Sequence, residues 1–175
     1  KVREDFFHRL TLYASFPEQN SMKEQINKLK INGNIYFWKY LENSRNYPGW
    51  NFTVNKIGGE NLLELIRLMR TCEWSSKKSI QITEPSQKQL KVPNNSNGKA
   101  KWKTFKILTL NHRKDFEKEY WKIIENPEEV EIIFGEEKLI KFESFLSRIL
   151  NNDGDFSISD NDEENILYFW WNIEN

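Results

Sequence analysis

Two segments of this chain gather charged side chains of a single sign, and they are its strongest candidates for chemistry with another molecule. Residues 77–114 hold ten basic side chains and only one acidic one, Glu84. Residues 153–164 hold six acids and no base. Such segments attract oppositely charged macromolecules over long range and speed their encounter. The six acids, which we assign to partner binding, are Asp153, Asp155, Asp160, Asp162, Glu163 and Glu164.

The formal net charge of the chain is zero, but the charge is unevenly distributed. Residues 1–112 contain 19 Lys and Arg against 9 Asp and Glu, whereas residues 113–175 contain 7 against 17. The two halves either neutralise each other within one fold or present a charged pole to a partner. Surface ion pairs contribute under about 1 kcal/mol each and need no functional purpose. We expect many internal pairs, and we take partner binding as the leading functional hypothesis.

Motifs for catalysis or cofactor binding do not emerge from the sequence. The two histidines, His8 and His112, lack the spacing of a metal-binding motif. The lone cysteine, Cys72, falls on the apolar side of a predicted helix and is expected to be buried. Gly58 and Gly59 precede that helix without the further glycines or lysine of a phosphate-binding loop. We therefore assign no catalytic residue, no metal and no cofactor.

Aromatic residues supply much of the expected core. The chain has 7 Trp, 6 Tyr and 12 Phe in 175 residues, which offsets its low mean hydropathy. Short aromatic runs near residues 36–38, 120–121 and 168–171 put rings on both faces of predicted strands. One face of each strand belongs to the core, and the other either packs in the core as well, which we favour, or contacts a partner. From these runs we nominate Trp121 and Trp171 as partner-binding aromatics.

Hydrophobic periodicity predicts the order of the elements. Alternating or fully apolar runs predict strands at 5–16, 35–41, 50–57, 79–84, 102–111, 119–125, 130–134 and 166–171. Helical spacing predicts a short helix after Ser21 and longer ones at 60–72 and 136–150. A long basic loop at about 85–101 and an acidic loop at about 151–165 complete the chain. The pattern predicts a single α+β domain with a mixed, largely antiparallel sheet packed against about three helices.

The leading functional hypothesis is a small intracellular protein-binding module. No apolar run approaches the roughly 20 residues that span a bilayer, and one cysteine suits a reducing compartment such as the cytoplasm. Immunity or antitoxin-type proteins, which neutralise bacterial toxins, share this size and lack of catalytic motifs. In such a protein the acidic C-terminal region would cap a basic surface of the toxin, and no membrane is involved. The sequence does not indicate an oligomeric state.

Two alternatives remain. A nucleic-acid-associated module would use the basic segment 77–114, although the overall pI near 7.0 makes nucleic acid the less favoured partner. An enzyme without a recognisable motif is the second alternative. The basic patch of the first alternative consists of Lys99, Lys101, Lys103 and Lys106.

Overall fold

The chain folds as an α+β domain with two mixed, largely antiparallel sheets. The computed structural model describes residues 22–42, 47–91 and 99–171, and in this part it contains three helices. The class predicted from sequence is confirmed, but the single sheet that was expected is divided in two. The first helix covers residues 22–28 of the described part. The predicted strand at 5–16 and the proposed helix cap at Ser21 lie outside the described residues.

Sheet A has five strands, and sheet B has four. All neighbouring strands run antiparallel except β2 with β9 and β5 with β7, which run parallel. In spatial order, sheet A contains β4 (Trp102–Thr104), β1 (Ile35–Tyr40), β2 (Trp50–Val54), β9 (Leu167–Phe169) and β8 (Phe156–Ile158). Sheet B contains β3 (Ser76–Gln81), β5 (Ile107–His112), β7 (Glu129–Phe134) and β6 (Trp121–Glu125).

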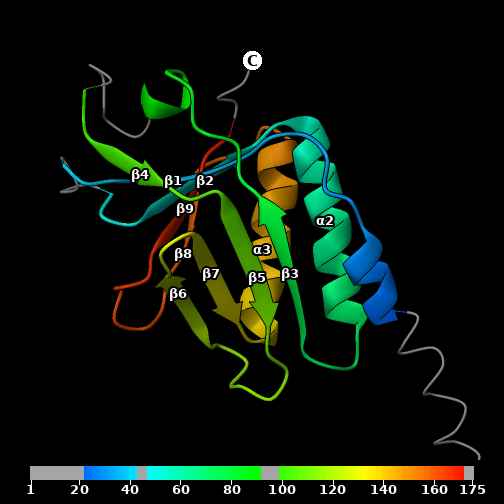
Figure 1. Ribbon diagram of the computed structural model, residues 1–175. Helices are drawn as coiled ribbons and strands as arrows, with labels where there is room; N and C mark the ends of the chain where they lie inside the picture. The colour runs from blue at the N-terminus through cyan, green and yellow to red at the C-terminus, as the bar shows by residue number, and fades with distance from the viewer. Residues whose placement is uncertain (1–21, 43–46, 92–98, 172–175) are drawn as a thin grey trace, which may run out of the picture.

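Two long helices, α2 (Lys56–Thr71) and α3 (Glu136–Leu150), lie side by side against one face of sheet B (Figure 1). Helix α2 also contacts β2, and α3 contacts β8 and β9, so both sheets share one core with the helices. Phe142 of α3 lies where the two sheets meet within that core. Its ring lies 5.1 Å from Phe169 of sheet A and 6.2 Å from Phe134 of sheet B.

Helix α3 has the bounds that its sequence pattern predicts, whereas α2 begins four residues earlier than predicted. The Asn55 side chain caps α2 by accepting a hydrogen bond from Gly58 N at 2.8 Å. Gly58 and Gly59 are therefore helical and do not form an entry turn. A side chain at Gly59 would meet Leu150 of α3 at 2.4 Å, so this glycine lets the two helices approach closely.

The predicted strand at 102–111 is in fact two strands that belong to different sheets. Strand β4 pairs with β1 in sheet A, and β5 pairs with β3 and β7 in sheet B. The chain changes sheet at Phe105 and Lys106. At this break the Thr104 hydroxyl donates a hydrogen bond to Phe37 O at 2.6 Å, which holds the end of β4 against β1. The alternation changes phase here, with two adjacent polar residues at 103–104 and two adjacent apolar residues at 107–108, but this change does not reveal that the two strands join different sheets.

The two predicted loops also contain regular structure. The basic loop at 85–101 includes a short 3₁₀ helix, η1 (Gln89–Lys91), whose Leu90 is buried against the outer face of sheet A. The acidic loop at 151–165 is interrupted by β8. Its second part, residues 160–165, forms a turn at the surface that carries four of the six acids. We call residues 160–165 the acidic turn.

Gly135, which precedes α3, is expected to be intolerant of any side chain. A Cβ atom there would lie 2.1 Å from Glu117 O and 2.7 Å from Lys118 O, and neither backbone atom can move freely. We predict that Gly135→Ala lowers the free energy of unfolding by at least about 2 kcal/mol through overpacking. Urea denaturation measures this change. Glu117→Ala is the control, because its side chain is exposed and the change should stay within about 0.5 kcal/mol. Equal stability of the two variants would contradict the prediction.

Candidate functional site

The acidic turn is held in shape by one of its own carboxylates. Asp160 Oδ1 accepts hydrogen bonds from the backbone N–H groups of Glu164 at 2.9 Å and Asn165 at 3.2 Å. The other oxygen of Asp160 accepts a hydrogen bond from the Asn165 side chain. Partial burial opposes ionisation of Asp160, but these hydrogen bonds outweigh it and hold the pKa of Asp160 below its ordinary value. Asp160 therefore positions the turn and is only partly available to a partner.

Asn165 attaches the acidic turn to sheet B. Its backbone oxygen accepts a hydrogen bond from Trp121 Nε1 at 2.6 Å, and its side-chain oxygen accepts one from Ile123 N at 3.2 Å. Both donors belong to β6, the edge strand of sheet B. The buried Lys138 supports the other end of the turn, because its Nζ donates a hydrogen bond to Ser159 O at 2.9 Å. The turn is thus anchored at both ends.

Trp121 is not a surface aromatic, contrary to the sequence-based assignment. Only 4% of the residue is exposed, and its ring stacks near Phe134 in the core. The alternation of β6 turns Trp121 and Ile123 inward, so the contact face of this strand carries other side chains. Trp171 is 37% exposed and follows the end of β9 that is farther from the acidic turn.

The six acids predicted to bind a partner differ in their surroundings. Asp153 forms an ion pair with Arg148, at 2.7 Å, and Asp160 is engaged within the turn. Asp155 is exposed but lies before β8, apart from the turn in sequence. The remaining three carboxylates are exposed and form no ion pair with a described residue. They are Asp162, Glu163 and Glu164.

Two tyrosine rings pack against a second hydrophobic cluster, on the outer face of sheet A. Tyr168 of β9 and Tyr47 are half-buried, and their ring centroids are 5.2 Å apart in an edge-on arrangement. Both rings also contact the buried Trp170. Burial raises the pKa of Tyr168, and the nearby Tyr47 and the negative charge of Glu163 act in the same direction. Glu163 therefore acts electrostatically on the Tyr168 hydroxyl.

We call this region the acidic–aromatic surface, formed by Asp162, Glu163, Glu164, Tyr47 and Tyr168. Sequence analysis identified the acids but not the tyrosines. The aromatic run at 168–171 is visible in the sequence, and alternation within it gives Tyr168 the face opposite to Phe169. Tyr47 lies about 120 residues away along the chain, and only the fold brings it there.

Half of the basic segment is neutralised within the structure. Five of its ten basic residues form ion pairs, and four of the five acids involved belong to the acidic half of the chain. Within the predicted patch, Lys101 pairs with Glu42 and Lys103 pairs with Glu125, whereas Lys99 and Lys106 are exposed. The pairs outside the patch are Lys77 with Glu131, Arg113 with Asp115 and Lys114 with Glu136.

His112 is completely buried and occupied by two contacts. Its Nδ1 lies 3.2 Å from Met69 O, and its Nε2 lies 3.2 Å from a carboxylate oxygen of Glu136. Ser76 is its neighbour across strands β3 and β5. Neither His112 Nε2 nor the Ser76 hydroxyl has a hydrogen-bond partner within the described structure. Cys72, at 1% exposure, is buried as predicted.

Comparison of the chain with protein-family models, with curated proteins and with solved structures finds no match in any of the three. Within residues 22–42, 47–91 and 99–171, no three His, Cys, Asp or Glu side chains are placed to share a metal ion. None of the helices in the described part combines the length and apolar character that a membrane crossing requires. Functional inference therefore depends on the geometry of the molecule.

Burial of His112 predicts a pH dependence of stability. Loss of solvation lowers the pKa of His112 below 6.5, despite the opposing effects of Met69 O and Glu136. The unfolded chain therefore binds a proton before the folded chain does, and acid favours unfolding. We predict that the free energy of unfolding falls as the pH decreases from about 7 to about 5. Denaturant titrations at several pH values measure this slope, which should be smaller in His112→Gln.

An NMR titration of the imidazole provides a measurement that does not need the variant to fold. The folded protein should show a midpoint for His112 below that of a free histidine. A midpoint above 6.5, or an unchanged slope in the variant, would contradict the prediction.

Proposed function

We propose that this protein is a protein-binding module that docks its acidic–aromatic surface on a basic surface of a partner protein. The observation that carries the proposal is the contrast between the two charged segments. Half of the basic segment is neutralised by internal ion pairs, whereas Asp162, Glu163 and Glu164 are exposed and form no ion pair with a described residue. Unpaired acids are available to steer association with a cationic surface.

The shape of the acidic turn supports binding as well as steering. Hydrogen bonds to Asp160 and contacts of Asn165 with β6 fix the backbone of the turn before any partner arrives. A prearranged segment loses less conformational entropy on binding than a flexible loop does. The turn can therefore present its carboxylates in one geometry, which favours a specific partner.

The neighbouring tyrosines supply the apolar part of such an interface. Tyr residues are enriched at energetically important interface positions, because the ring buries a large area and the hydroxyl forms hydrogen bonds. Tyr47 and Tyr168 are half-buried, and each ring contacts Trp170, so their positions are restrained. They are prepared to contact a partner without a large loss of side-chain entropy.

Within this class, the proposal extends to an immunity or antitoxin-type protein of a bacterial cytoplasm. Such a protein would cover a basic functional surface of a toxin domain with its acidic turn. The support is the exposed, ordered negative charge combined with the small size of the chain. The nucleic-acid alternative has less support, because Lys101 and Lys103 of its patch are engaged in ion pairs. The enzyme alternative has no assigned catalytic residue.

Neutralising the acidic turn should reduce capture of the partner. In Asp162→Asn/Glu163→Gln/Glu164→Gln the side chains keep their size but lose three charges. We predict that the tagged variant recovers at least about tenfold less of a stoichiometric partner from nuclease-treated lysate of the source cells, because charge-steered association slows. Quantitative mass spectrometry compares the recovery with that of the unmodified protein.

A variant with the same change in net charge is the matched control. Glu24→Gln/Glu60→Gln/Glu64→Gln alters three acids on the first helix and α2, none of which belongs to the acidic–aromatic surface. It should capture the partner as the unmodified protein does. Equal loss in both triple variants would show that only net charge matters. If nuclease treatment by itself removes the material captured by the unmodified protein, the basic segment is favoured as the binding surface instead.

A further inference from the structure

Asn32 and Gly33 form an exposed Asn-Gly pair between the first helix and β1. In such a pair the backbone nitrogen of the glycine can attack the side-chain carbonyl carbon of the asparagine, because the glycine has no Cβ atom to hinder the approach. A second Asn-Gly pair, at 97–98, lies outside the described residues. The proposed function does not involve Asn32 or Gly33.

The two groups that would react are not held by hydrogen bonds. The Asn32 side chain is exposed and forms no hydrogen bond with a described residue. The backbone N–H of Gly33 also has no acceptor among the described residues, so it loses no hydrogen bond when its nitrogen attacks. The side chains of Asn34, Asn55 and Asn165 are, in contrast, held by hydrogen bonds.

The fold requires glycine at position 33. Its φ angle is +85°, which residues other than glycine rarely adopt. A Cβ atom there would lie 2.3 Å from Gly58 N and 2.7 Å from Asn55 Oδ1, and both atoms belong to the start of α2. Replacement of Gly33 would therefore displace the start of α2, so the reactive pair is tied to the fold.

Two hydrogen bonds attach this segment to α2, one on each side of the peptide bond that follows Asn32. Asn32 N donates to Asn61 Oδ1 at 3.0 Å. Asn34 N donates to Asn55 Oδ1 at 2.9 Å. The same Asn55 oxygen caps α2 by accepting a hydrogen bond from Gly58 N. The length of main chain between residues 32 and 34 is therefore matched to the first turns of α2.

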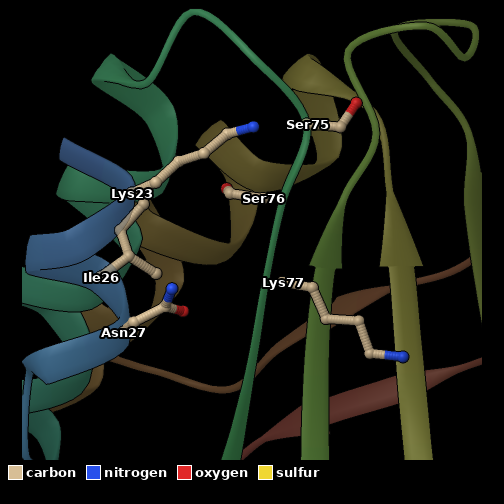
Figure 2. A pocket seen from close by; sticks show the side chains of 6 residues that line it. All are labelled: Lys23, Ile26, Asn27, Ser75, Ser76 and Lys77. Carbon is tan, nitrogen blue, oxygen red and sulfur yellow. The ribbon is translucent and has the colours of Figure 1, made fainter. Parts of the chain in front are cut away.

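The elements at the two ends of the segment are fixed as well. Ile26 and Asn27 of the first helix face Ser76 and Lys77 of β3 across a small cavity (Figure 2). Lys78 Nζ donates a hydrogen bond to Asn27 O at 2.6 Å, which ties the helix to the strand. At the other end the chain enters β1, which lies between β4 and β2 in sheet A. A longer main chain would therefore disturb the contacts with α2.

We propose that Asn32 is a site of spontaneous deamidation, and that the isoaspartate it forms loosens the start of α2. Gly33 N attacks Asn32 Cγ, and the side-chain nitrogen leaves as ammonia with the proton of the Gly33 N–H, which closes a succinimide ring. Water then opens the ring at either carbonyl and gives aspartate or isoaspartate. In isoaspartate the main chain gains a methylene carbon, so the hydrogen bonds of Asn32 N and Asn34 N to α2 cannot both persist. The site is independent of the acidic–aromatic surface.

The test ages the whole folded protein in mildly alkaline buffer and follows the tryptic peptide of residues 31–39 by tandem mass spectrometry. Cleavage before residue 31 and after residue 39 separates this peptide from the second Asn-Gly pair. We expect aspartate and isoaspartate to accumulate at Asn32, while Asn34 in the same peptide stays intact. An unchanged Asn32 in the aged protein, or conversion only after denaturation, would overturn the proposal.

Amide hydrogen exchange tests the effect on α2. In the isoaspartate form, separated by ion exchange, the amides of Asn34 and Gly58 should exchange at least about fivefold faster than in the fresh protein. Asn32→Asp is the matched control, because it carries the same new charge on a main chain of normal length. Its amides should exchange as in the fresh protein. Equal acceleration in Asn32→Asp, or unchanged exchange in the isoaspartate form, would overturn the proposed loosening.

Discussion

Hydrogen bonds that Asn165 accepts connect the edge of sheet B to the segment that enters sheet A. The backbone and side-chain oxygens of Asn165 accept bonds from β6, and the chain then passes through Ile166 into β9. Ile166 O in turn accepts a hydrogen bond from Trp50 N of β2 at 2.8 Å. Two consecutive residues therefore join the two sheets. The same Asn165 side chain bonds to Asp160, so the connection that joins the sheets also sets the form of the acidic turn.

The distribution of charge follows from the way the two halves of the chain combine. Acids of the second half reach basic residues of the first half, as in the pair of Lys77 with Glu131 across sheet B and the pair of Lys103 of sheet A with Glu125 of sheet B. Such exposed or half-exposed pairs add little to stability. Their main consequence is that the positive segment is locally compensated. The negative charge of the acidic turn has no such compensation among the described residues, and the net charge of zero conceals this difference.

Local patterns in the sequence predict a helix or strand well when burial of one face of that element determines where it begins and ends. The apolar positions of α3 give its bounds correctly, and Cys72 is buried as helical spacing predicts. Contacts between distant segments are not predictable in this way. The change in alternation near Lys106 does not reveal that β4 and β5 join different sheets, and the burial of Trp121 depends on how β6 faces the helices. The six acids looked equivalent in sequence, but hydrogen bonding to Asn165 separates Asp160 from the others.

Asn165 holds the acidic turn in a fixed shape against β6, and amide hydrogen exchange tests this role most directly. The relevant amides are those of Ile123 and Glu164, whose N–H groups bond to Asn165 and Asp160. Both should be protected in the unmodified protein. In Asn165→Ala both should exchange at least about tenfold faster, while the amide of Leu110 in the centre of sheet B keeps its protection. Rapid exchange of Glu164 in the unmodified protein, or unchanged protection in the variant, would contradict a turn that is ordered by these contacts.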